Sequence, residues 1–143
     1  MLYAASRRQH LVEKVLPALE KGYIVICDRF VDSSLAYQGF ARNLGIDEIY
    51  DINMFAINNK WPDITILLDI DPEVGLSRIM SNRKQEVNRL DLEGLNFHNK
   101  VHQGYEIIKE KYADRITLID GNNSPEVVFN EVYSLIKNKI NEH

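Results

Sequence analysis

Hydrophobic positions in this chain follow two patterns, helical spacing and short continuous runs. Leu11, Val15 and Leu19 recur every fourth residue, with Val12 and Leu16 beside them, which predicts a helix over residues 2–21 that Gly22 ends. Three apolar runs read YIVIC at 23–27, ITILLDI after Pro62 and Asp63, and ITLID at 116–120. Runs of this kind are typical of strands buried on both faces of a sheet.

The rest of the chain predicts further helices between and after these runs. They are expected at about 33–42, 46–59, 72–82 and 93–112, and from Ser124 to near the end. Asp71 and Pro72 suit the cap and first position of one of them. Buried strands that alternate with helices predict an α/β fold with a parallel sheet and flanking helices. We expect one domain over 1–143, with a polar lid-like stretch at about 81–93.

Composition narrows the function classes. The formal net charge is −4, which argues against a nucleic-acid polymer as ligand. Cys27 is the single cysteine, so no disulfide can form within the chain, which fits a reducing cytoplasm. No apolar run approaches ~18 residues, so we expect no membrane segment. The first helix begins at Met1 without a capping residue, which suggests a piece of a longer chain.

The segment DRFVDSSLAYQG, residues 28–39, directly follows the first apolar run. Ligands of open parallel sheets bind outside the carboxyl ends of the strands. Arg29 there can grip a phosphate, and Asp28 can accept a hydrogen bond from a sugar hydroxyl or from water around a metal. Ser34, Tyr37 and Gln38 are expected on one helix face, where Gln38 suits the edge of a base. A solvated Asp–Arg surface pair is the alternative.

A second group of candidate binding residues lies on the predicted first helix. Tyr3 and Arg7 lie four residues apart on the first helix, and Arg7 is in line with the apolar positions. A charge there needs a partner, which could be no more than an acidic loop residue.

The polar stretch is preceded by Arg78 and contains Arg83, Lys84 and Arg89. Arginines on a loop that closes suit phosphoryl transfer, although a solvated loop has the same composition.

The string DRFVDSSLAYQG resembles the pattern of bacterial thymidylate kinases. MLYAASRRQHL, PDITILLDIDPEVGLSRI and NRLDLEGLNFHNKVHQGY resemble other segments of that family, in the same order. The resemblance implies transfer of the γ-phosphoryl group of ATP to dTMP, with Mg²⁺, in dTTP biosynthesis. It implies a partial P-loop nucleoside-monophosphate-kinase fold that lacks its first two strands. A homodimer and a complementing N-terminal P-loop fragment are the protein partners it suggests.

The resemblance also implies residue roles. On the dTMP side, Tyr3 would stack on thymine, Arg7 would contact thymine and the monophosphate side, and Arg29 would hold the phosphate. Asp28 would lie near the sugar and the metal-bound phosphates.

Ser34 and Gln38 would read the thymine edge, and Tyr37 would lie under the sugar and disfavour a ribose. On the ATP side, Arg83 and Arg89 would reach the phosphates, and Asn122 would border the adenine with its neighbours from Asp120 to Asn123. Asp28, Arg29, Arg83 and Arg89 are thus the expected catalytic residues.

The sequence departs from the family in one respect. It has no GxxxxGKS or GxxxxGKT motif, and its seven glycines are scattered. We therefore expect chain 1–143 alone to be inactive. The alternatives are a non-catalytic dTMP-binding remnant, one half of a split enzyme, or another P-loop nucleotide kinase. The AYQG and SRRQHL strings disfavour the last of these.

Overall fold

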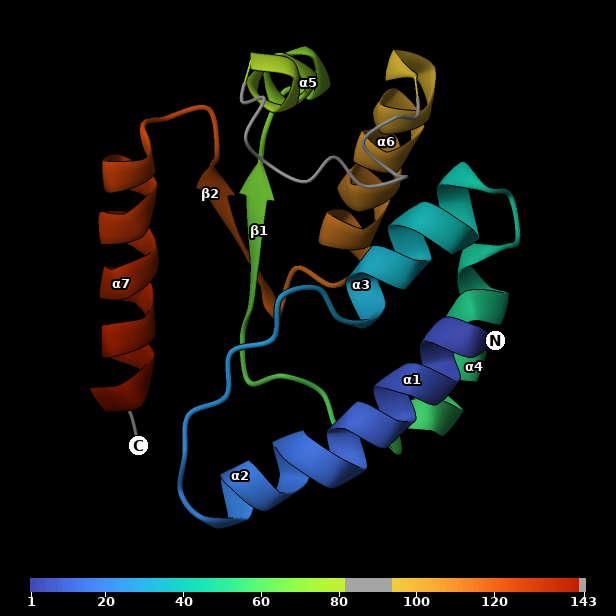
Figure 1. Ribbon diagram of the computed structural model, residues 1–143, viewed down its shortest axis with the longest axis vertical. Helices are drawn as coiled ribbons and strands as arrows, with labels where there is room; N and C mark the ends of the chain where they lie inside the picture. The colour runs from blue at the N-terminus through green and yellow to red at the C-terminus, as the bar shows by residue number, and fades with distance from the viewer. Residues whose placement is uncertain (82–93, 142–143) are drawn as a thin grey trace. The chain divides into compact units, whose positions relative to one another are not determined.

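The structure of the protein is a computed structural model that describes residues 1–81 and 94–141. It contains two compact units. Figure 1 labels their helices and strands. Unit 1 comprises Met1–Pro62 and Lys100–Glu110, and unit 2 comprises Asp63–Asn99 and Lys111–His143. Each unit is described by itself below.

Unit 1 is helical in its described residues. The predicted first helix forms as α1 (Leu2–His10), the π-helical segment η1 (Leu11–Val15) and α2 (Leu16–Glu20). The second predicted helix forms as α3 (Val31–Ser34) and the π-helical segment η2 (Leu35–Ala41), and the third as α4 (Ile46–Ile57). Residues 100–110 of α6 (Leu95–Lys111) complete the unit. The predicted helices of this unit are confirmed, and their π-helical segments were not predicted.

The core of unit 1 lies where these helices meet. Val31, Leu35, Ile57 and Ile108 are almost fully buried. On α6, a Cβ added to Gly104 would lie 3.1 Å from the Cβ of Phe40 and 3.2 Å from the Cα of Ala36. Only glycine allows α6 to lie so close to η2, and this close approach brings the next residue, Tyr105, against the same segment.

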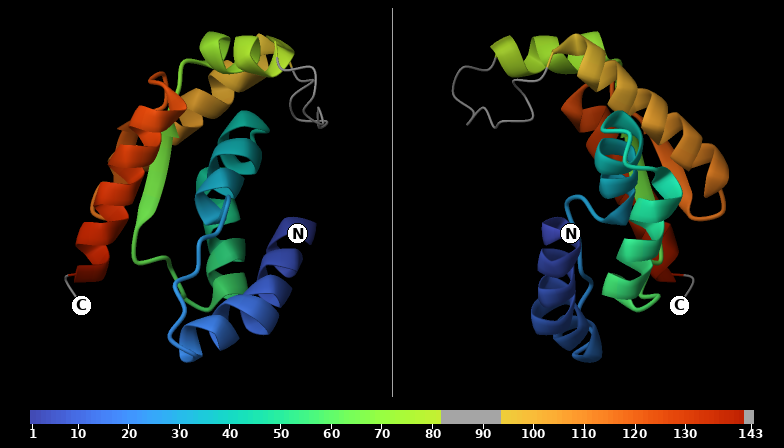
Figure 2. Two further views of the ribbon diagram at one scale, coloured as in Figure 1. Left: turned by 60° about the vertical axis from the view of Figure 1, so that its left-hand side comes forward. Right: turned by 90° about the vertical axis from the view of Figure 1, so that its right-hand side faces the viewer.

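Unit 2 contains a parallel pair of strands, β1 (Thr65–Asp69) and β2 (Ile116–Asp120), with Thr65 opposite Ile116 and Asp69 opposite Asp120. Helix α5 (Pro72–Ser81) follows β1, and α7 (Pro125–Asn141) follows β2 and packs beside it (Figures 1 and 2). Parallel strands followed by helices confirm the α/β class. The expectation that the chain lacks the first two strands of the family's fold remains a prediction.

The starts of α5 and α7 are fixed by caps that the sequence predicts. The Asp71 carboxylate accepts a hydrogen bond from the Glu73 N–H at 2.8 Å and from the Val74 N–H at 3.4 Å. The hydroxyl of Ser124 accepts the N–H of Val127 at 3.4 Å. Each cap is followed by proline, whose fixed φ suits the first helical turn.

The predicted strand at 23–27 is wrong. Those residues belong to no helix or strand, and the sheet in the described residues contains only β1 and β2. A strand needs a neighbour about 4.8 Å away to satisfy its N–H and C=O groups, and no described segment pairs with this run. Its side chains are also not buried, since Ile24 is 66% exposed and Ile26 is 81% exposed.

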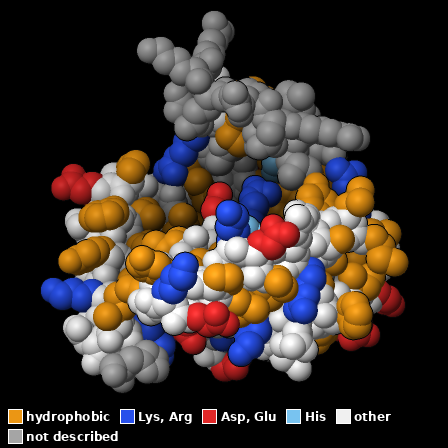
Figure 3. Space-filling model, turned by 60° about the horizontal axis from the view of Figure 1, so that its bottom comes forward, with side chains coloured by type: hydrophobic (Ala, Val, Ile, Leu, Met, Phe, Trp, Pro, Cys, Tyr) orange, Lys and Arg blue, Asp and Glu red, His pale blue; other side chains and the backbone are white. Residues whose placement is uncertain are grey.

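Other apolar side chains are exposed as well, and the face in Figure 3 shows many of them among charged residues. On α7, Phe129 and Tyr133 are exposed and stack on each other with ring centroids 6.0 Å apart. Among the helices the structure describes, none is both long and apolar enough to cross a membrane.

Candidate functional site

The turn after residues 23–27 brings Arg29 against Tyr37. Arg29 has a φ of 63°, in the left-handed region that side-chain-bearing residues rarely adopt. Its guanidinium carbon lies 5.1 Å from the centroid of the Tyr37 ring, and its Nη2 group donates to the Tyr37 hydroxyl at 3.4 Å. The unusual backbone therefore accompanies a cation held on an aromatic face, at an exposed position where an anion can approach it.

Arg7 reaches the same segment from α1. Its Nη2 group donates to the backbone carbonyl of Phe30 at 3.1 Å and to the hydroxyl of Ser34 at 3.0 Å, and its Nη1 group donates to the side-chain carbonyl of Asn53. Its guanidinium also lies 5.4 Å from the Phe30 ring centroid. Burial lowers the pKa of Arg7 from its usual value, and the negative charge of Asp32 opposes this shift.

Tyr105 also packs against Tyr37. Its hydroxyl donates to the Ser33 hydroxyl at 3.0 Å, and its ring meets that of Tyr37 nearly edge-on, with centroids 6.4 Å apart. Burial raises the pKa of Tyr105. The hydrogen bond with Ser33 opposes this rise, as does the charge of Arg29. Tyr105 and Arg29 thus both contact the Tyr37 ring.

Three of the residues predicted to bind dTMP or the metal-bound phosphates lie at exposed or half-buried positions. Tyr3 is 63% exposed near the start of α1, and Asp28 is exposed in the turn. Gln38 is half-buried in η2, where its backbone carbonyl accepts the N–H of Leu44. The structure therefore brings together Arg7 with Ser34 and Arg29 with Tyr37, and it leaves the carboxylate of Asp28 open to solvent.

The π-helical geometry of η2 changes which side chains share a face. The N–H of Arg42 donates to the carbonyl of Tyr37, five residues earlier, at 3.1 Å. A π-helix has more residues in each turn than an α-helix, so the predicted shared face of Ser34, Tyr37 and Gln38 does not follow from α-helical spacing. Ser34 is buried, whereas Tyr37 and Gln38 are half-buried.

Sequence reasoning missed Phe30, Asn53 and Tyr105. The run DRF contains Phe30, but its contribution is a backbone carbonyl, which no side-chain motif reveals. Asn53 gave a weak signal, as a polar residue among the apolar positions Ile49, Ala56 and Ile57 of α4. Tyr105 follows Gly104 in HQGY, and only the packing of α6 on η2 shows its role.

The predicted adenine-side residue Asn122 lies in unit 2, in the turn after β2. Its N–H and side-chain amide both donate to the Asp120 carboxylate at 2.9 Å, and its side-chain carbonyl accepts the Asp71 N–H at 3.2 Å. Arg78 donates to the carbonyls of Gly121 and Asn122, each at 2.8 Å. This turn is therefore rigidly held. Arg83 and Arg89 lie outside the described residues.

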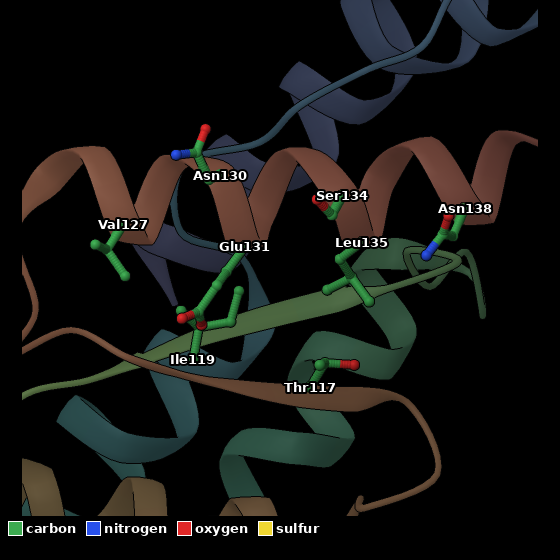
Figure 4. Close-up of a pocket in the computed structure, with 8 residues that line it drawn as sticks. All are labelled: Thr117, Ile119, Val127, Asn130, Glu131, Ser134, Leu135 and Asn138. Atoms are coloured by element: carbon green, nitrogen blue, oxygen red, sulfur yellow. The ribbon is translucent and has the colours of Figure 1, made fainter.

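A separate groove in unit 2 has a volume of about 570 Å³ and lies between β2 and α7 (Figure 4). Ile119 points into it from the strand, and Glu131 and Leu135 point toward the strand from the helix. It contains none of the predicted site residues.

In unit 1, two arginines thus converge with the hydroxyls of Ser34 and Tyr37 on the turn and helix that follow residues 23–27. Guanidinium groups bind phosphate and carboxylate well, and the aromatic rings offer stacking surface. The fold belongs to the α/β class, and this cluster of guanidinium groups, hydroxyls and rings is its candidate anion site.

Comparison with known proteins names the group within this class. The thymidylate kinase family model matches residues 1–132. The chain is 54% identical over 140 residues to a thymidylate kinase of Geobacillus thermodenitrificans, covering 98% of this chain and 62% of that protein. It is 58% identical over 137 residues to a thymidylate kinase of Clostridium novyi, covering 96% and 67%. This chain belongs to the thymidylate kinase family, and it spans about two thirds of the length of these relatives.

Proposed function

We propose that this chain forms the dTMP-binding part of a thymidylate kinase, which transfers the γ-phosphoryl group of ATP to dTMP and yields ADP and dTDP. The observation that carries the proposal is the convergence of Arg7 and Arg29 on residues 30–37. Arg7 bonds Phe30 and Ser34 there, and Arg29 lies on Tyr37. A nucleoside monophosphate offers the phosphate and the ring that such groups bind.

The proposed dTMP contacts follow from this geometry and from the family. Arg29 is exposed and can reach a phosphate without losing the Tyr37 ring beneath it. Gln38 and Ser34 would face the thymine edge, and Tyr3 would cover its ring. Tyr37, held by Tyr105, would lie under the sugar and leave little space for a ribose 2′-hydroxyl.

On the ATP side, Asn122 is proposed to border the adenine, and Arg83 and Arg89 to reach the phosphates. Mg²⁺ would come with ATP and neutralise its phosphate oxygens. Such an ion prefers oxygen ligands and keeps several waters. The exposed carboxylate of Asp28, beside the phosphate-binding Arg29, fits contact with those waters.

A second function is a dTMP-binding protein without turnover, or one half of an enzyme that another polypeptide completes. The sequence favours it because its 143 residues include no GxxxxGKS or GxxxxGKT motif to cradle the ATP phosphates. We therefore propose that chain 1–143 binds dTMP and does not transfer phosphoryl groups by itself.

Calorimetric titration of chain 1–143 tests the binding proposal. We expect dTMP to bind, and Arg29→Met to weaken dTMP binding at least tenfold while weakening thymidine binding less, because thymidine lacks the phosphate. Arg42→Met, which removes an exposed arginine at the end of η2, is the matched control and should leave the dTMP affinity unchanged. No binding of dTMP to the wild-type chain would contradict the proposal.

A second assay separates the two functions. The chain is mixed with dTMP, ATP and Mg²⁺, and ADP is followed with time. We expect no ADP above background from the chain alone. Formation of ADP only when a protein with the P-loop motif is added would support a split enzyme. Turnover by the chain alone would refute the proposal of inactivity.

A further inference from the structure

Asn53 is a buried polar side chain beside the candidate site. It lies on α4 and is only 2% exposed, with the buried apolar residues Ile49, Ala56 and Ile57 on the same helix. A carboxamide at such a position costs stability unless its hydrogen-bonding groups are satisfied. Its partners therefore indicate why a polar group is kept there.

The carboxamide is held in one orientation. Its NH₂ group donates to the Ile49 carbonyl, one helical turn earlier, at 2.7 Å. Its carbonyl oxygen consequently points away from the helix backbone and accepts the Nη1 group of Arg7. The opposite orientation would place two donors against each other, the amide of Asn53 and the guanidinium of Arg7, and would leave two carbonyl oxygens facing each other.

Asn53 completes a set of acceptors from three segments around Arg7. The other two are the Phe30 carbonyl in the turn and the Ser34 hydroxyl in α3. These three use three of the five N–H groups of the guanidinium. Among the described residues, these three bonds leave the Nε–H and the second Nη1–H as the donors that Arg7 could still offer to a ligand.

We propose that Asn53 is a positioning residue that aims Arg7 at the bound nucleotide. This inference rests on the proposed function, since it takes dTMP as the ligand. A flexible arginine side chain loses conformational entropy when a ligand orders it. Because Asn53, Phe30 and Ser34 hold the guanidinium in advance, that cost is paid during folding. Asn53 acts on affinity through Arg7 and needs no contact with the nucleotide.

A double-mutant cycle tests the proposal on the full chain. The dTMP dissociation constant is measured calorimetrically for wild type, Asn53→Ala, Arg7→Met and the double variant. We expect Asn53→Ala to weaken binding about tenfold, and to weaken it less than twofold further when Arg7 is already methionine. Equal effects of Asn53→Ala in both backgrounds would overturn the proposal, because a merely structural residue acts independently of Arg7.

Two further variants keep the test decisive. Asn53→Asp retains an acceptor toward Arg7 but loses the donor to the Ile49 carbonyl, so it should lower the free energy of unfolding while keeping dTMP affinity within about threefold of wild type. Loss of affinity as large as in Asn53→Ala would count against positioning. Should Asn53→Ala not fold, Asn53→Leu, of similar volume and without an acceptor, replaces it in the cycle. Asn130→Ala, on the exposed side of α7, is the matched control and should bind dTMP as wild type does.

The outcomes separate this inference from the proposed function. If wild type does not bind dTMP, both fall. If wild type binds dTMP and the cycle is additive, the dTMP site stands and the role of Asn53 falls.

Discussion

Two apolar runs in this chain have similar composition and different structures. YIVIC at 23–27 and TILLD at 65–69 are both rich in β-branched and aliphatic residues. The second forms β1 and pairs in register with β2, while the first forms no strand and has mostly exposed side chains. An apolar run is thus a strand only where a neighbouring strand satisfies its backbone groups.

The turns that follow the two runs are held in different ways. The turn after β1 is held by residues that directly follow β2. The Gly121 N–H donates to the Asp69 carbonyl at 2.6 Å, and Asn122 accepts the Asp71 N–H. The turn after residues 23–27 is held by side chains from helices distant in sequence, since Arg7 bonds the Phe30 carbonyl and Tyr105 bonds Ser33. The turn after β1 is held by the segment that follows its paired strand, and the turn after residues 23–27 by side chains of α1 and α6.

The largest expected loss of stability comes from a substitution in the paired strand β2. Ile119 in β2 is 5% exposed, so Ile119→Ala removes buried contacts and leaves a cavity. We expect the free energy of unfolding to fall by about 2–5 kcal/mol. Urea unfolding followed by circular dichroism measures it, and a loss below about 1 kcal/mol would show that β2 is not packed as described.

Alanine substitutions at two glycines compare the cost of a side chain in the turn after β2 with its cost at the end of the first helix. A Cβ on Gly121 would lie 3.0 Å from the Asp69 carbonyl oxygen and 3.3 Å from the Ile70 Cβ. Gly121→Ala should therefore cost about 1–3 kcal/mol by overpacking. Gly22 has a φ of +78° and open space, so Gly22→Ala should cost only about 1 kcal/mol, from backbone strain. The reverse order in thermal unfolding would contradict this account of Gly121.

Tyr105→Phe tests the turn that side chains hold. Loss of the hydrogen bond to Ser33 should lower the free energy of unfolding by about 1 kcal/mol at pH 7. Because burial raises the folded-state pKa of Tyr105, the unfolded chain releases this proton first, near the ordinary pKa of about 10. The stability contributed by this shift is present below pH 10 and is lost as pH rises through the folded pKa.

The measurement for this variant is urea unfolding at several pH values. The wild-type advantage over Tyr105→Phe should shrink above pH 10, and an advantage that grows there would contradict the burial of the hydroxyl. Tyr133→Phe, at an exposed position of α7, is the control and should change stability little at pH 7.

The smallest expected effect lies in the unpaired run. Ile26 is 81% exposed, so Ile26→Ala should change the free energy of unfolding by no more than about 0.5 kcal/mol. The same substitution in β2 is its matched comparison. A loss above about 1 kcal/mol at Ile26 would show that residues 23–27 are packed, and it would remove the contrast between the two runs.

The sequence predicted best the features that depend on local chemistry. The strand at 116–120 and the helix starts after Asp71 and Ser124 form where expected, because apolar runs and caps act within a few residues. The strand at 23–27 failed because pairing depends on another segment. The π-helical form of η2 was not predicted. A Cβ on Gly39 would lie 3.0 Å from the Ile46 Cα, so this segment is packed closely against the start of α4, which spacing along one helix does not reveal.

The candidate site divides in the same way. Arg7, Arg29, Ser34 and Tyr37 were predicted from one motif and one helix face, and the structure brings them into two contacting pairs. Asn53 and Tyr105 could not be predicted, since each contacts the site from a helix far away in sequence. Their importance depends on burial and close packing, which a motif does not encode. The nucleotide roles of all these residues remain predictions.

The central claim is that the turn after residues 23–27, and not the end of the paired sheet, carries the dTMP site. The most direct test is a dTMP titration of isotope-labelled chain followed by amide NMR shifts. The account predicts shifts concentrated at residues 29–38, with Asn53 and Tyr105 among the affected positions. Shifts confined to β1, β2 and α7, or no shifts at saturating dTMP, would contradict it.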